Sequence, residues 1–170
     1  TTVAAPILPP GRMYMLSLKL MLLLALPIAA FTTFLAYFLV RLLAGPEYLP
    51  HGAIALQLVI WSIPFGWLNS VTNYVLIALG LEGMQPRAFT IAVGFNIIAN
   101  LIFIPRFSYV AASVTTILSE VVLMLVFAYY LRRRMSGVNW FDLMWKPFLV
   151  TAVMVAAMWA GNQIHLLLAL

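Results

Sequence analysis

The feature of this sequence that most limits its fold is a series of apolar stretches, each about as long as a membrane is thick. Of the 170 residues, 65% are hydrophobic and only 8% are charged. A soluble domain usually carries about a quarter charged residues and at most about half apolar ones. A helix needs roughly 20 apolar residues to cross about 30 Å of hydrocarbon. The sequence therefore predicts an all-α integral membrane protein, and its composition excludes a nucleic-acid-binding domain despite a net charge of +5.

We expect a polytopic transmembrane helix bundle with five full spans and the start of a sixth. The five predicted spans cover about residues 20–40, 53–79, 88–104, 109–131 and 147–160. A last apolar run, 164–170, rises only about 10 Å as a helix and is too short to cross. Because the chain also begins without Met, in the proline-containing segment 1–19, we expect it to be a piece of a larger transporter, with 147–170 forming the fifth span and a truncated sixth.

The lysines and arginines are distributed unevenly between the loops that alternate along the predicted spans. Seven belong to one side of the membrane: Arg12, Lys19, Arg87, Arg132, Arg133, Arg134 and Lys146. Only Arg41 and Arg106 belong to the other side. Basic residues are enriched in cytoplasmic loops. The segment 1–19 and the basic, interfacial loop 132–146 are therefore predicted to be cytoplasmic, in a multi-pass protein of the inner (plasma) membrane.

Polar side chains recur inside the predicted spans at helical spacing. They are Asn69 and Asn73 in the second span, Asn96 and Asn100 in the third, and Ser113, Thr116 and Glu120 in the fourth. A rise of 1.5 Å per residue places Asn69, Asn96 and Glu120 near the middle of the membrane, where they could form one polar cluster. Such side chains either join helices by hydrogen bonds or line a transport pathway. Both interpretations stay open, including proton or cation coupling at Glu120.

Two prolines and three basic residues are further candidates. Pro27 and Pro64 lie inside predicted spans, where proline removes a backbone donor and bends a helix; a kink can border a transport cavity or serve packing alone. Lys19, Arg41 and Arg106 could attract a phosphate, or they could be anchors at the ends of the spans.

No arrangement of residues predicts an enzyme, a metal site or a cofactor. The histidines, His51 and His165, are far apart in sequence and have no paired carboxylates beside them. The chain contains no cysteine, so it has no thiolate ligands, and it has no glycine-rich phosphate loop. We therefore expect neither catalysis nor ATP hydrolysis in this chain.

Four short segments resemble motifs of one transporter family. They are Leu43-Ala44-Gly45-Pro46-Glu47-Tyr48; Ala78-Leu79-Gly80 with Arg87; Asn96 and Asn100 with Ile104-Pro105; and Ser108 to Glu120. In this order and spacing, over about residues 12–160, they resemble the C-terminal lobe of polysaccharide (O-antigen type) flippases of the multidrug/oligosaccharidyl-lipid/polysaccharide exporter superfamily. The chain departs from that pattern at Ser108 and Ala111, where the family usually has glycine.

The resemblance implies one lobe of a two-lobed flippase, whose N-terminal lobe would be the missing partner. It implies export of an undecaprenyl-diphosphate-linked oligosaccharide by alternating access, without ATP hydrolysis. The alternatives are a multidrug/cation antiporter of the same superfamily, a polysaccharide polymerase or glycosyltransferase, and a membrane subunit without transport activity.

Overall fold

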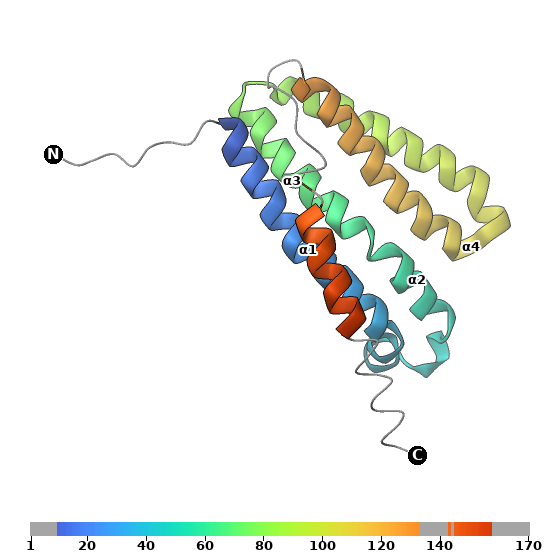
Figure 1. Ribbon diagram of the computed structural model, residues 1–170. Coiled ribbons are helices and arrows are strands. Elements are labelled where there is room, and N and C mark those ends of the chain that lie inside the picture. The colour runs from blue at the N-terminus through green and yellow to red at the C-terminus, as the bar shows by residue number, and fades with distance from the viewer. Residues whose placement is uncertain (1–9, 133–142, 144, 158–170) are drawn as a thin grey trace.

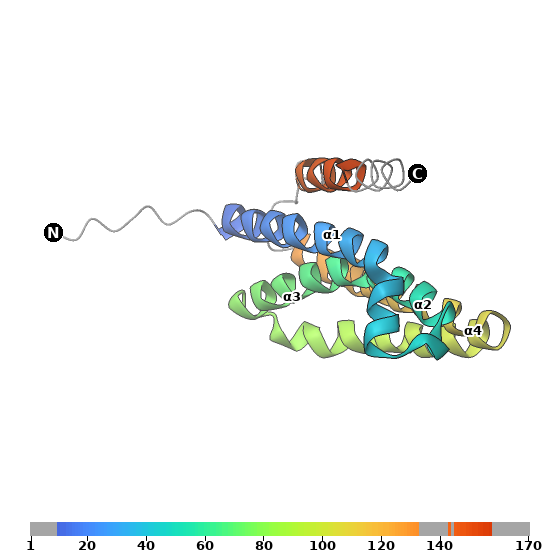
Figure 2. The same ribbon diagram turned by 90° about the horizontal axis from the view of Figure 1, so that it is seen from below.

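A computed structural model describes residues 10–132, 143 and 145–157, and this part of the chain is helical without any strand. The helices are α1 (Pro10–Leu43), α2 (His51–Val59), α3 (Ser62–Ala78) and α4 (Gln85–Arg132), with single 3-10 turns at Pro46–Tyr48 and Glu82–Met84. A further helix covers Trp145–Ala157. Figure 1 shows α1 to α4 in one bundle, with the α2–α3 pair between α1 and α4, and Figure 2 shows the Trp145–Ala157 helix set apart from them beyond α1.

The long helix α4 is folded back on itself at Ser108. This residue has φ 52° and ψ −134°, far from helical values. A hydrogen bond of 2.8 Å from Asn96 Nδ2 to Ser119 Oγ joins the two halves. In a straight helix these residues would be about 34 Å apart. We call 85–107 the first arm and 109–132 the second arm; they lie next to each other at the right of Figure 1.

The predicted span 53–79 is interrupted, because α2 ends at Val59 and α3 begins at Ser62. Pro64 gives the reason. In a continuous helix its ring would clash with the carbonyl of Ile60, and it has no amide hydrogen to donate to that carbonyl. The Ile60 carbonyl instead accepts a 3.1 Å hydrogen bond from the Ile63 amide. Pro64 itself occupies the first turn of α3, where a backbone donor is not needed.

The core lies where α1, α3 and both arms of α4 meet. Its largest fully buried side chains include Phe127, Leu18 and Leu76. On α1 the fully buried positions Ala25, Ala29 and Ala36 are small, which allows the neighbouring helices to approach closely. Large apolar side chains point outward all around the bundle, among them Phe31, Phe38, Leu101, Leu125 and Tyr74. Such a surface suits a lipid environment.

Three helical segments are long and apolar enough to cross a membrane: Gly11–Leu43, His51–Ala78 and Glu82–Arg132. The predicted count of five full spans is therefore not supported. The third and fourth predicted spans, 88–104 and 109–131, are the two arms of one helical segment. Of the fifth, 147–160, the structure describes residues 147–157, which belong to the apolar helix Trp145–Ala157, and 158–160 lie outside the described residues.

The predicted cytoplasmic segment 1–19 differs from the structure, and several other predicted segments lie outside the described residues. Residues 10–19 of the predicted cytoplasmic segment are part of α1, which begins at Pro10. Residues 1–9, most of the predicted loop 132–146 (133–142 and 144), and the predicted sixth span (164–170) lie outside the described residues.

Candidate functional site

The central feature of the bundle is a contact between Asn69 of α3 and Glu120 of the second arm. Asn69 Nδ2 donates to the carboxylate oxygen Oε2 of Glu120 at 2.7 Å and to the backbone carbonyl of Glu120 at 2.9 Å. Asn69 is 4% exposed and Glu120 is half-buried. Glu120 is twelve residues from Ser108 and twelve from Arg132 (120 − 108 and 132 − 120), which places it about 18 Å from either end of its arm.

Gly66 makes room for this carboxyl group. It lies three residues before Asn69, on the same face of α3. A Cβ added at Gly66 would lie 3.7 Å from Glu120 Oε2 and 3.8 Å from its Cδ. A Cβ alone would make an ordinary van der Waals contact there, whereas a side chain longer than that of alanine would displace the carboxyl group. Gly66 was not among the residues predicted from the sequence, although a glycine one turn away from Asn69 was a signal that could have indicated it.

A second polar group connects the two arms of α4. Asn96 Nδ2 donates to Ser119 Oγ, and Asn100 Nδ2 donates to Asn96 Oδ1 at 2.9 Å. Ser119 in turn donates to the carbonyl of Thr115 in its own helix at 2.7 Å. The polar stripe predicted on this arm, Ser113 and Thr116 with Glu120, was thus incomplete, since the residue that Asn96 contacts is Ser119.

The predicted single cluster is therefore two groups, one on each side of the second arm. Glu120 faces α3 and Ser119 faces the first arm, since consecutive residues on a helix point about 100° apart. Asn73 joins neither group through its side chain; the hydrogen bond at this residue is a 3.4 Å contact from Gln85 Nε2 to its backbone carbonyl. Asn69, Asn96 and Glu120, which could have formed one cluster, are thus divided between two hydrogen-bonded groups.

Three amide oxygens in this region are buried without a donor from the described residues. They are Oδ1 of Asn69, Asn73 and Asn100. A buried polar atom without a hydrogen bond costs about 1–3 kcal/mol. These oxygens could therefore accept a hydrogen bond from water or from a protonated carboxyl group, or they could coordinate a cation. Within the described residues, no three acidic, histidine or cysteine side chains are grouped in a way that would hold a metal ion.

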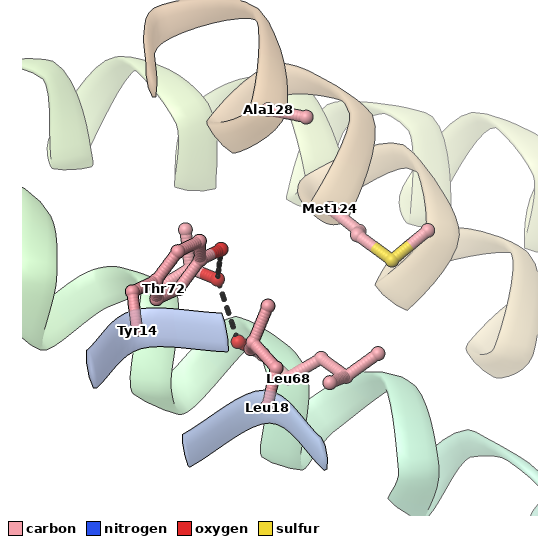
Figure 3. A pocket seen from close by; sticks show the side chains of 6 residues that line it. All are labelled: Tyr14, Leu18, Leu68, Thr72, Met124 and Ala128. Carbon is pink, nitrogen blue, oxygen red and sulfur yellow. Dashed lines mark hydrogen bonds between the residues drawn. The ribbon is translucent and has the colours of Figure 1, made fainter. Parts of the chain in front are cut away.

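A separate hydrogen bond links the beginning of α1 to α3. Thr72 Oγ1 donates its one hydrogen to the Leu68 carbonyl at 2.7 Å, so in the 2.8 Å bond between Tyr14 Oη and Thr72 Oγ1 the tyrosine is the donor. Figure 3 shows this pair beside a cavity of about 10 Å³ that Met124 and Ala128 close from the second arm. That volume is at the lower limit for one water molecule. Nothing in the sequence pattern indicated this contact.

The remaining candidate residues do not join the central site. α1 continues as a helix through Pro27. Lys19 and Arg41 are 22 residues apart on α1 (41 − 19), which corresponds to about 33 Å. Arg41 and Arg106 are both exposed. Lys19 and Arg41 therefore cannot act together on one phosphate.

The fold and the outward-facing apolar surface define the class of this protein: it is a membrane protein with transmembrane helices. Over 112 residues, 66% of the chain, it is 24% identical to the uncharacterized membrane protein MJ1068 of Methanocaldococcus jannaschii. The matched region is 22% of that relative's length, so the chain spans about a fifth of it. No family model matches the sequence, and no solved structure matches the chain.

Proposed function

We propose that this chain is part of the C-terminal lobe of a flippase that moves a lipid-linked oligosaccharide, of the undecaprenyl-diphosphate type, to the outer leaflet of the plasma membrane. The observation that carries the proposal is the Asn69–Glu120 pair, in which a carboxyl group inside the bundle is held by a hydrogen bond of 2.7 Å. A carboxyl group at this depth is costly, and such residues are typical of ion and proton pathways. The motif resemblance supplies the substrate class.

In this proposal Glu120 binds and releases a cation or proton, and that step drives alternating access. Asn69 holds the carboxyl group in place through Nδ2, while its free Oδ1 is available to the coupling ion or to water. Gly66 leaves the space beside the carboxyl group open. No nucleotide site is needed, because the ion gradient or the membrane potential supplies the driving force.

Loss of the gene in its natural host tests the function. We expect a lipid-linked oligosaccharide to accumulate in the cytoplasmic leaflet and surface polysaccharide to disappear, with restoration by the intact gene. If surface polysaccharide is unchanged and the cells instead become sensitive to cationic drugs, the multidrug/cation antiporter replaces the flippase as the function.

The coupling role is tested by Glu120→Gln in the full protein. Glutamine keeps an oxygen acceptor for Asn69 Nδ2, so expression and folding should be unchanged, but it cannot release a proton. Export should fall to the level of the deletion strain. Glu82→Gln is the matched control, because Glu82 is exposed in the turn before α4. Normal export by Glu120→Gln at equal protein levels would leave Glu120 with a structural role only.

A further inference from the structure

A groove runs between α1 and the Trp145–Ala157 helix, away from the Asn69–Glu120 site. It has a volume of about 360 Å³, within the roughly 300–1,000 Å³ typical of small-molecule sites. The residues that line it are Leu16, Lys19, Leu20, Leu23, Lys146 and Pro147. Figure 2 shows the Trp145–Ala157 helix (red) beyond α1, on the opposite side from the first arm of α4 (yellow-green).

The α1 wall of this groove is apolar and continuous. Leu16, Leu20 and Leu23 follow the spacing of four and three residues that places side chains on one face of a helix. All three are exposed. Pro147, on the facing helix, is fully buried. The groove thus offers a straight hydrocarbon surface along α1, open to the surrounding bilayer.

Two ammonium groups belong to the same groove. Lys19 lies on the same face as the leucines of α1, and Lys146 lies at the start of the facing helix, where its Nζ is 5.6 Å from the Trp145 ring centroid. None of the described residues that line the groove is acidic.

Both lysines lie at the predicted membrane boundary. The apolar run of α1 begins directly after Lys19, and Trp145 with Lys146 precedes the apolar part of the second helix. Tryptophan and lysine prefer this headgroup level. The charge distribution of the chain places this boundary on the cytoplasmic side, where anionic lipids meet basic pockets between helices.

From this combination we infer that the groove binds an anionic glycerophospholipid of the bilayer. One acyl chain lies along Leu20 and Leu23, on the membrane side of Lys19, and the phosphate accepts hydrogen bonds from the ammonium groups of Lys19 and Lys146. The lipid fills the space between α1 and the Trp145–Ala157 helix, and it neutralises two positive charges that would otherwise repel each other. This inference is independent of the proposed flippase function.

The test uses the full protein in detergent, incubated with phosphatidylglycerol or with phosphatidylcholine of the same acyl chains, and counts bound lipid by native mass spectrometry. Phosphatidylglycerol should bind more tightly than phosphatidylcholine. The double variant Lys19→Gln/Lys146→Gln should weaken phosphatidylglycerol binding about thirtyfold, since each lysine near an anionic lipid contributes about fivefold. Lys19→Arg/Lys146→Arg should bind within about threefold of the unmodified protein.

Two further variants distinguish a specific site from general attraction. Arg87→Gln removes one charge from the same predicted side but outside the groove, and it should leave binding unchanged. Leu20→Trp fills the groove while both lysines remain, and it should weaken phosphatidylglycerol binding. A thermal unfolding curve for each variant shows that the fold is retained.

Equal binding of the two lipids, an unchanged affinity in the glutamine double variant, or an equal loss in Arg87→Gln would overturn the inference. So would displacement of phosphatidylglycerol by undecaprenyl phosphate at a lower concentration, because the groove would then belong to a polyprenyl ligand. None of these four results bears on the Glu120→Gln experiment, because that experiment measures export and not lipid binding.

Discussion

At the scale of single residues, two positions fix the turns between helices through their backbone conformation. Gly80 has φ 69°. Its amide donates to the Ile77 carbonyl at 2.9 Å, and the Leu81 amide donates to the Leu76 carbonyl at 2.8 Å. This pair of hydrogen bonds is the Schellman motif, which ends a helix with a left-handed residue, usually glycine. The Ala78-Leu79-Gly80 motif therefore has a structural cause, namely the end of α3.

Ser108 occupies a backbone conformation that suits glycine better than serine. Its φ of 52° and ψ of −134° lie where a Cβ atom is strained. Ser108→Gly should therefore raise the free energy of unfolding by about 1 kcal/mol. The control is Ser17→Gly in α1, where the backbone is helical and the hydroxyl bonds to the Met13 carbonyl of its own helix; glycine there should lower stability by several tenths of a kcal/mol. Unfolding in mixed micelles measures both. A loss of stability in Ser108→Gly would show that the turn is not strained.

At the scale of helices, sequence patterns predicted the apolar segments well and their connections poorly. The predicted ranges 20–40, 88–104 and 109–131 all lie within helices of the structure. The interruption at 60–61 was missed because Ile60 and Trp61 are apolar, so hydropathy continues across it. The turn at Ser108 was expected as a short loop, whereas helix occupies both sides up to a single non-helical residue.

The side-chain contacts of the candidate site were only partly predictable. Spacing placed Asn69 and Glu120 at matching depths, and the structure joins them by a 2.7 Å hydrogen bond. Spacing alone does not give the rotation of one helix against another. For that reason Ser119 was missed as the residue that Asn96 contacts, and Asn96 was expected beside Glu120, from which the structure separates it.

The contact between the arms of α4 predicts a measurable contribution to stability. Ser119→Ala removes the acceptor of Asn96 Nδ2 and should cost about 0.6–2 kcal/mol, the range for hydrogen bonds between membrane helices. Thr116→Val is the matched control on the same arm, because the Thr116 hydroxyl bonds only to the Ala112 carbonyl of its own helix. Steric trapping or unfolding in micelles provides the free energies. Equal costs for the two variants would mean that the Asn96 contact contributes nothing.

At the scale of the whole molecule, the helices give the bundle two distinct ends. One end holds the turn after α1 and the tip of the α4 hairpin, since the rings of His51 and Tyr109 meet edge to face with centroids 5.5 Å apart. The other end holds the turn between α3 and α4, where Gln85 contacts Asn73. Each helical segment and each arm therefore runs from one end to the other, as alternating spans require.

The basic residues divide between these ends as the positive-inside rule requires. Arg41 and Arg106 belong to the end with His51, and Arg87 and Arg132 to the end with Gln85. This arrangement predicts that the Gln85 end is cytoplasmic. Glu47 and Arg87 are exposed residues in or next to the turns at opposite ends, so they suit single-cysteine labelling in a chain that has no cysteine.

Glu47→Cys should react with a membrane-impermeant thiol reagent in intact cells, whereas Arg87→Cys should react only after the membrane is made permeable. The reason is the cost of moving several basic side chains across the bilayer, each about 2.5–3.5 kcal/mol at its centre. A permeant reagent that labels both variants equally serves as the control for accessibility. Labelling of Arg87→Cys from outside, with Glu47→Cys protected, would reverse the orientation. It would also place Lys19 and Lys146 at the outer leaflet. Cysteine labelling therefore determines the topology, and together with the lipid-binding measurement it determines which leaflet supplies the anionic lipid of the groove.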